Sequence, residues 1–286
     1  MIYSALIFSI ASLCVAACLW VLLPGRNWPA TAQRRIALGA ILGMGCLALY
    51  VSQLPGVGGL ATGLIYYPLT GIVLIAASAT ITSRNPVHSA AWFALSLLGV
   101  SGLFFLEGAP WLALANLGVH SMVLLGIYYF VLREAIARRC VAYDRKTNEP
   151  LLSAVTGAVI AGVLAAAIGN APVEKSALSH NYLVLGAILF GIGLTGFLSR
   201  RNLILRFLSI DIILQGVLLS MVAWGRWHND FGGQTMVAVI LAAIGCEVAI
   251  ALMLIRFSLN CRGCLDIISK HETDEGTPLQ SGRYDE

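Results

Sequence analysis

Residues 202–224 read NLILRFLSIDIILQGVLLSMVAW, and residues 235–257 read TMVAVILAAIGCEVAIALMLIRF. Each stretch is apolar and long enough to cross a membrane as one helix, because about 20 residues span the hydrocarbon core. Each also holds one carboxylate, Asp211 in the first stretch and Glu247 in the second. At a rise of about 1.5 Å per residue, both lie roughly 14 Å from one end of their stretch, near the middle of a bilayer core about 30 Å thick.

These two carboxylates dominate the interpretation of the chain. An ionised carboxylate inside hydrocarbon costs several kcal/mol, so such residues usually face a protein interior or a water-filled path. Two protonatable groups at one depth, on consecutive helices, therefore predict a pathway for protons. A second interpretation is open for both residues: a buried acid whose hydrogen bonds only hold helices together.

The composition of the whole chain is that of a helical membrane protein. Of its 286 residues, 58% are hydrophobic and 11% are charged, whereas soluble proteins have about 25% charged residues. Repeated apolar stretches of about twenty residues predict an all-α, polytopic transmembrane bundle. The nine predicted spans are 2–23, 35–53, 64–82, 88–106, 110–132, 151–169, 180–199, 202–224 and 235–257.

The basic residues predict the orientation of this bundle. Short cytoplasmic loops are enriched in Lys and Arg. Loops after even-numbered spans hold only Lys175 and Arg226, and we therefore expect an outside N-terminus and a cytoplasmic C-terminus. The net charge of +4 reflects this topology and not nucleic-acid binding. The basic residues of the predicted cytoplasmic segments are Arg26, Arg34, Arg35, Arg84, Arg133, Arg138, Arg139, Arg145, Lys146, Arg200, Arg201, Arg262, Lys270 and Arg283.

Polar interruptions divide the chain into four parts. Residues 1–63 contain two N-terminal helices, residues 64–178 a middle block of helices, and residues 179–266 a final block of three. Residues 267–286 form a polar tail whose mixed charge predicts disorder.

The seven cysteines of the chain are scattered and do not suggest a disulfide framework. Cys261 and Cys264 have the spacing of a metal or redox pair, but no second pair or histidine cluster accompanies them. We therefore expect free thiols there. The sequence contains no phosphate-binding loop, haem motif or metal-ligand cluster, so we expect no cofactor or metal in this chain.

Five motifs occur in order along the final block. They are 186–196 (GAILFGIGLTG), 200–203 (RRNL), 208–211 (LSID), 245–250 (GCEVAI) and 262–266 (RGCLD). Together they resemble the K subunit of bacterial NADH:quinone oxidoreductase, respiratory complex I. The resemblance implies a three-helix unit with one carboxylate in each of its last two helices, at Asp211 and Glu247. It also implies that both carboxylates belong to a proton relay within the membrane.

Two motifs of the middle block, 83–90 (SRNPVHSA) and 98–109 (LGVSGLFFLEGA), resemble the J subunit of the same enzyme. The chain thus resembles a J–K fusion that carries two additional N-terminal helices. A J subunit of this family has five helices and ends in the cytoplasm, whereas a K subunit starts outside. Here four predicted helices separate the two starts, which brings the chain to the correct side of the membrane.

The chain departs from the family pattern in two places. Asp211 replaces a glutamate, and Gln215, four residues on and therefore on the same helix face, replaces the usual asparagine. Residues 119–123 read VHSMV, where the J family has Val-Tyr-Ala-Gly-Ala and a π-bulge. There His120 replaces the tyrosine, and Asn116 replaces an inward glutamate. His120 can exchange protons near neutral pH, or it can form hydrogen bonds between helices; both interpretations stay open.

Three other charged residues have simpler interpretations. Glu107 lies in the short turn between the fourth and fifth predicted spans, where we expect it to be solvated. Arg206 and Arg256 lie near helix ends, from which a long side chain reaches the headgroup region. We expect Arg206 to do this rather than to pair with Asp211.

The resemblance implies a non-catalytic membrane-arm subunit of a proton-translocating NADH:quinone oxidoreductase in the bacterial inner membrane. Partner subunits are expected to hold NADH, FMN, iron–sulfur clusters and quinone, and to include the quinone-site subunit and antiporter-like subunits. Three alternatives remain open. They are a subunit of a multisubunit Na⁺/H⁺ antiporter, a membrane-bound hydrogenase or ferredoxin-linked relative, and a structural membrane scaffold.

Overall fold

The structure is a computed structural model. It describes residues 14, 17–22, 38, 39, 41–43, 45, 59–83, 86–128, 150–169 and 177–262. The predicted spans 2–23 and 35–53 lie largely outside these residues, and Cys264 and the tail 267–286 lie wholly outside them.

The all-α prediction is confirmed for the part of the chain that the structure describes. The helices are α3 (Leu60–Thr82), α4 (Pro86–Leu106), α5 (Pro110–Gly126), α7 (Pro150–Gly169), α8 (Ala177–Ser199), α9 (Leu203–His228) and α10 (Gly232–Arg262). Each lies on a span predicted from the sequence: α5 ends before the predicted residue 132, whereas α9 and α10 continue beyond their predicted ends at 224 and 257. Six of these helices, all but α5, are long and apolar enough to cross a membrane.

Helix α5 is the shorter apolar helix of the set, with 17 residues. It passes into a π-helical turn at Ile127 and Tyr128, and the remainder of the predicted span 110–132 lies outside the described residues. The helix is regular over 119–123, the segment where the J family has its π-bulge. The π-helical distortion of α5 therefore lies nearer the C-terminal end of the helix than the family pattern implies.

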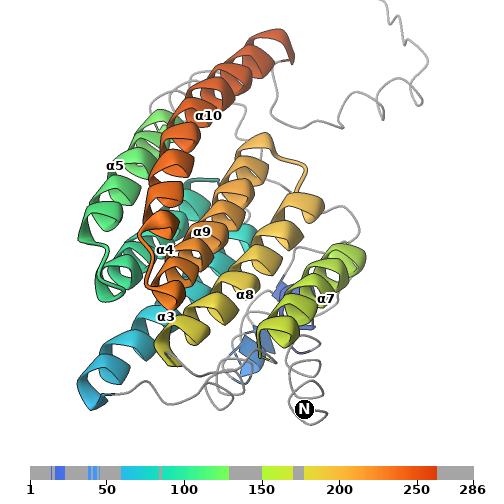
Figure 1. The fold of residues 1–286 in the computed structure, drawn as a ribbon. Coiled ribbons are helices and arrows are strands. Elements are labelled where there is room, and N and C mark those ends of the chain that lie inside the picture. Colours follow the sequence, from blue (N-terminus) through green and yellow to red (C-terminus); the bar gives the residue numbers. More distant parts are fainter. Residues whose placement is uncertain are drawn as a thin grey trace, which may run out of the picture.

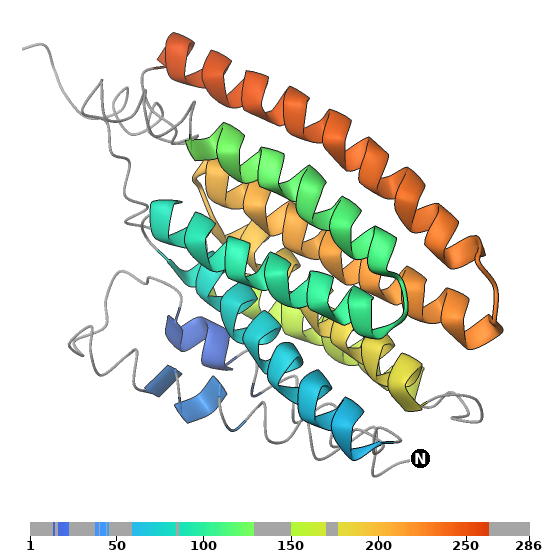
Figure 2. The same cartoon turned by 90° about the vertical axis from the view of Figure 1, so that its left-hand side faces the viewer.

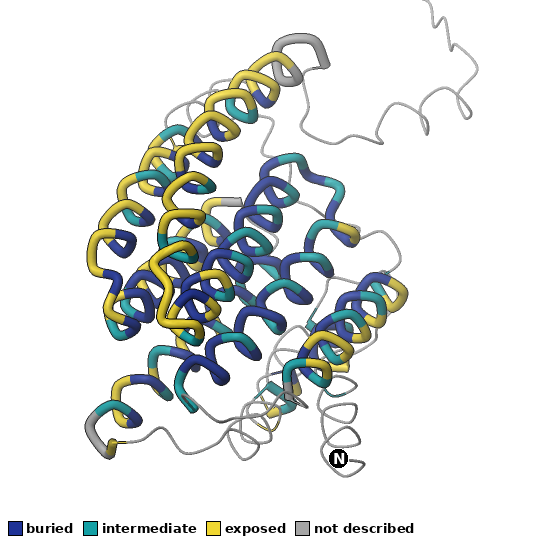
Figure 3. Tube along the Cα trace, in the orientation of Figure 1, coloured by how far each residue is buried: buried dark blue, intermediate teal, exposed yellow. Residues whose placement is uncertain are grey.

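The helices form an elongated bundle around the α8–α9 pair (Figures 1 and 2). Helix α7 packs on α8 along one side, and α10 packs on α9 and α5 along the other. Helices α3 and α4 also contact α9, so α9 is surrounded on most of its sides. Figure 3 shows the result: α8 and α9 are largely buried, whereas α10 and the outer face of α5 are exposed.

Glycines bring α8 and α9 into close contact. A Cβ atom added to Gly186 of α8 would lie 2.7 Å from the carbonyl oxygen of Gly216 in α9, and one added to Gly216 would lie 2.6 Å from the Gly186 carbonyl oxygen. Both distances are shorter than normal carbon–oxygen contacts, so only glycine fits at this crossing. Small residues at crossings are how helices gain packing contacts in lipid, where the hydrophobic effect does not drive helices together.

Arg200 ties the α8–α9 connection to the end of α3. Its side chain is fully buried. Its Nε donates a hydrogen bond to the Ile81 carbonyl oxygen at 2.6 Å, and its Nη2 donates one to the Ser83 carbonyl oxygen at 3.0 Å. These are C-terminal carbonyls of α3, which lack partners within their own helix and carry the negative end of the helix dipole. Arg200 thus holds helices together. The sequence alone had suggested only that it marks the predicted cytoplasmic side of the bundle.

We expect Gly216→Ala to lower the stability of the protein by about 1–3 kcal/mol, the usual effect of adding a methyl group to a well-packed core. The physical reason is that the new Cβ would force α8 and α9 apart. Thermal unfolding in detergent measures the effect, and Gly118→Ala is the matched control because a Cβ atom there meets nothing within 4 Å. Equal melting temperatures for the two variants would contradict the close crossing.

Candidate proton-transfer site

Asp211 lies in the interior of the bundle. Its side chain is 1% exposed, and its Oδ2 has no hydrogen-bond partner among the described residues. Helix α9 starts at a capped end, where the Asn202 side chain accepts a hydrogen bond from the Ile204 N–H at 2.9 Å. Two turns further along, Asp211 is enclosed, because α8, α4, α3 and α10 all contact α9. The expectation that this carboxylate faces protein rather than lipid is therefore confirmed.

Gln215 follows Asp211 on the same face of α9 and is also fully buried. The Ser96 hydroxyl of α4 donates a hydrogen bond to Gln215 Oε1 at 3.4 Å, and Gln215 Nε2 has no partner among the described residues. The amide therefore connects the carboxylate region of α9 to α4. Its Nε2 group can still donate a hydrogen bond to a water molecule or to a neighbouring carboxylate.

His120 and Asn116 extend this polar region along α5. The Asn116 amide donates a hydrogen bond to the Ser101 hydroxyl of α4 at 3.0 Å, and His120 Nδ1 lies 2.9 Å from the Asn116 carbonyl oxygen. Since a carbonyl only accepts, Nδ1 carries the proton, and His120 Nε2 is left as an acceptor in the neutral ring. No described residue bonds that Nε2. The hydrogen bond stays within α5, so it does not support the interpretation of His120 as a link between helices.

We call these side chains the buried polar row. The row consists of Asp211, Gln215, Ser96, His120, Asn116 and Ser101, which are at most 4% exposed. Its members follow α9, α4 and α5 from mid-helix toward the α4–α5 turn, in steps of roughly 6–8 Å along the helix axes. Asp211, Gln215, His120 and Asn116 each retain a polar atom without a partner among the described residues. Buried polar atoms of this kind are usually bonded to ordered water.

Glu247 occupies a different environment from Asp211. It lies on the exposed side of α10 and not in the interior of the bundle. It is nevertheless close enough for its charge to act on Asp211. Within this chain the two carboxylates therefore approach one region from opposite sides, Asp211 from inside and Glu247 from the surface.

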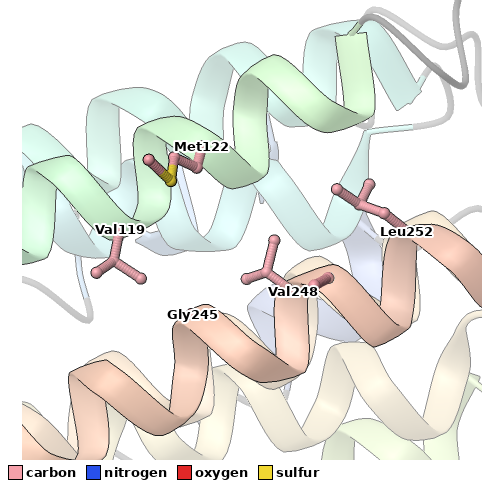
Figure 4. Close-up of a pocket in the computed structure, with 6 residues that line it drawn as sticks. Val119, Met122, Gly245, Val248 and Leu252 are labelled. Carbon is pink, nitrogen blue, oxygen red and sulfur yellow. The ribbon is translucent and has the colours of Figure 1, made fainter.

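An apolar groove of about 230 Å³ lies between α5 and α10. Val119 and Met122 of α5 face Gly245, Val248 and Leu252 of α10 across it (Figure 4). A Cβ atom added to Gly245 would meet nothing within 4 Å, so the glycine leaves the groove open. The surface between α5 and α10 is thus concave and apolar, on a different face of α10 from Glu247.

Glu107 is buried, and the expectation that it is solvated was wrong. Its side chain is 2% exposed, and the Ser179 hydroxyl of α8 donates a hydrogen bond to its Oε1 at 3.0 Å. Glu107 directly follows the end of α4, and Gly108 then takes φ +79 in the turn, a conformation that favours glycine. Sequence analysis missed this because a turn of a few polar and small residues usually lies in solvent.

Arg206 does not pair with Asp211. Its Nε donates a hydrogen bond to the Arg200 carbonyl oxygen at 2.6 Å, and its guanidinium lies 5.8 Å from the centre of the Phe197 ring. The prediction that it forms no ion pair with Asp211 agrees with these contacts. Within the described residues, no group of three or more His, Cys, Asp or Glu side chains could hold a metal ion.

These features define a multi-pass helical membrane protein with ionisable side chains in its interior. Residues 76–214 match the family described as NADH-ubiquinone/plastoquinone oxidoreductase chain 6, and residues 181–272 match the family described as chain 4L. The chain belongs to the membrane subunits of NADH-quinone oxidoreductase, as a fusion of the J and K subunits of complex I. It is a subunit of that enzyme complex.

Individual relatives match the final block. The K subunit of NADH-quinone oxidoreductase from Bordetella pertussis is 47% identical over 79 residues, which is 27% of this chain and 76% of the relative. The K subunit from Bordetella petrii is 48% identical over the same length. That from Legionella pneumophila is 37% identical over 89 residues, 31% of this chain and 88% of the relative. No solved structure matches the chain.

The buried position of Glu107 predicts a pH-dependent stability. Burial raises the pKa of Glu107 above its ordinary value, while the Ser179 hydrogen bond and the Arg226 charge lower it by less. The folded state therefore binds this proton more tightly than the unfolded state. The free energy of unfolding is then highest below the ordinary pKa of about 4.5 and falls as the pH rises through the raised value.

We expect Glu107→Gln to remove this contribution, because the amide keeps the size of the side chain and cannot ionise. Melting temperatures of the wild type and the variant, measured from acidic to mildly alkaline pH, give the test. The wild type should lose more stability than the variant as the pH rises. Parallel curves would show that Glu107 has the same pKa in the folded and unfolded states.

Proposed function

We propose that this chain carries part of the intramembrane proton relay that couples quinone reduction to proton pumping. The observation that supports the proposal most strongly is Asp211, a carboxylate enclosed at the middle of α9 with one oxygen unbonded within the described residues. Gln215 lies one turn away from Asp211. The charge of Glu247 acts on Asp211 from the other side. A carboxylate used only to hold helices together would be expected to have its hydrogen bonds satisfied.

The proposed mechanism uses the mutual charge of the two acids. When two carboxylates interact, protonation of one favours ionisation of the other, and the pair gains and loses protons as a unit. Quinone reduction in a partner subunit would change the hydration and helix geometry around Asp211 and Glu247. The pair would then take up a proton from one side and release it to the next group of the relay. His120, whose Nε2 has no partner among the described residues, would accept or deliver protons along the buried polar row.

The exposed side of α10 is the proposed contact with a neighbouring membrane subunit. Only 22% of the membrane-crossing window of α10 is buried within this chain, against 67% for α8. A carboxylate exposed to lipid at the middle of a membrane costs about 3 kcal/mol or more. We infer that an antiporter-like subunit covers Glu247 and the exposed side of α10. The quinone-site subunit and the subunits with NADH, FMN and iron–sulfur clusters are the other proposed partners.

The proposed topology follows from the sequence. It has nine spans in the bacterial inner membrane, with the N-terminus outside and the C-terminus in the cytoplasm. The α4–α5 turn and the α9–α10 turn then both face outward. The Arg226 side chain of α9 donates a hydrogen bond to the Glu107 carbonyl oxygen at 3.2 Å, so these two turns do lie at one end of the bundle.

We expect Asp211→Asn and Glu247→Gln each to lower proton uptake into inverted vesicles by roughly tenfold or more, the usual effect of losing a group that transfers protons. NADH-driven uptake in vesicles that contain the assembled complex is the measurement. Asp230→Asn is the matched control, since it makes the same chemical change on an exposed residue of the α9–α10 turn. Full pumping by both variants, with the complex assembled, would leave only the scaffold function.

We also expect the side chains of Asp211 and Gln215 to fill one shared space, so that a longer acid requires a shorter amide. Asp211→Glu adds a methylene to a fully enclosed site, which typically costs about 1–3 kcal/mol. The double change Asp211→Glu with Gln215→Asn removes one methylene again and should recover most of the lost pumping and stability. A double variant no better than Asp211→Glu alone would show that the two side chains do not share one space.

A further inference from the structure

The most unexpected ionisable group of the molecule is Glu107, which the relay described above does not use. We propose that Glu107 is a proton-binding site at the α4–α5 end of the bundle, and that it exchanges protons between the aqueous phase at that face and the buried polar row. This inference rests on the proposed relay and extends it by one residue.

The geometry around Glu107 is that of an enclosed site for one proton. The carboxyl group is 2% exposed; Oε1 accepts the Ser179 hydrogen bond, and Oε2 has no partner among the described residues. A buried carboxylate with an unbonded oxygen is unfavourable when ionised, and a proton on that oxygen removes the charge. The raised pKa of the group agrees with this.

The site is next to water on one side. The Arg226 side chain is exposed, yet its guanidinium reaches the Glu107 carbonyl oxygen, and its positive charge acts on the carboxyl group. A Cβ atom added to Gly108 would lie 3.0 Å from Arg226 Nη1, so the arginine lies directly against this turn. An exposed cation beside a buried acid favours the ionised form, so it can assist release of the proton to the aqueous phase.

On its other side the site approaches the buried polar row. The Tyr182 hydroxyl of α8 donates a hydrogen bond to the Leu103 carbonyl oxygen at 3.0 Å, and the charge of Glu107 acts on Tyr182. Ser101, the end of the row, lies on α4 six residues before Glu107, roughly 9 Å along the helix axis and about a third of a turn around it. The proposed transfer between them runs through ordered water, which Asn116 Oδ1, an atom with no partner among the described residues, would help to hold.

Other ionisable groups near Glu107 come from the elements packed against it. Helix α8 contributes Tyr182 and, on the same turn as Ser179, His180, which is buried and has no partner for its Nδ1 among the described residues. Helix α9 contributes Arg226, and Tyr66 of α3 packs its ring on that of Tyr182 at 5.2 Å. Of these groups, Arg226 is the one with a fixed charge, so it dominates the electrostatic effect on Glu107 near neutral pH.

Infrared difference spectroscopy on the assembled complex tests proton binding directly. The wild type should show a carboxylic carbonyl band that disappears as the pH rises through the raised pKa of Glu107. The band should be absent in Glu107→Gln and present in Asp211→Asn. Ser179→Ala should move its disappearance to higher pH, because a hydrogen bond to the charged form is lost. Absence of a Glu107-dependent band would overturn the proposal.

Proton uptake in inverted vesicles tests whether this proton belongs to the relay. Glu107→Gln should lower uptake roughly tenfold, while Ser179→Ala, which also breaks the contact between α4 and α8 but keeps the carboxyl group, should pump and show a shifted pH profile. Full pumping by Glu107→Gln together with loss of pumping by Asp211→Asn would overturn the role of Glu107 and leave the relay standing. Full pumping by Asp211→Asn would instead reject the relay itself. Equal loss of pumping in Glu107→Gln and Ser179→Ala, without a pH shift, would show that Glu107 only holds helices together.

Discussion

The free energy needed to place a carboxylate at the middle of a membrane is the constraint on which the rest of this structure depends. Asp211 is accommodated because α9 is enclosed by its neighbours, with α8 at one side and α3, α4 and α10 at the others. The glycines at the α8–α9 crossing make that enclosure tight, and Arg200 holds the α8–α9 connection against α3. Each of these features protects the carboxylate from lipid without neutralising it.

The free energy of placing a carboxylate in the membrane also constrains Glu247, which this chain does not enclose. Its position on the exposed side of α10 is unfavourable for a chain alone in lipid, and becomes favourable when a neighbouring subunit covers it. A pair of acids with one member in the interior and one at the subunit surface is suited to pass protons between subunits. The exposed apolar side chains of α10, such as Ile250, Met253 and Leu254, provide a surface on which such a neighbour could pack. The proposed function of this chain therefore depends on assembly.

Much of this organisation could be predicted from the sequence. The apolar stretches predicted the described helices, and the spacing of Asp211 and Gln215 predicted their shared face. The serines of the buried polar row could not be found in this way, because Ser96 and Ser101 look like ordinary small packing residues until α4 is placed against α9 and α5. Glu107 was misjudged for a related reason. Its burial depends on contacts with Ser179 and Arg226, which lie 72 and 119 residues away in the chain.

The most direct test of the account is whether Asp211 and Glu247 exchange protons as one unit during turnover. Infrared difference spectra of the assembled complex, recorded as NADH drives quinone reduction, should contain a carboxyl band that is lost in Asp211→Asn. The same band should shift in Glu247→Gln, because the charge that acts on Asp211 is then removed. A spectrum in which neither variant changes any carboxyl band would contradict the relay.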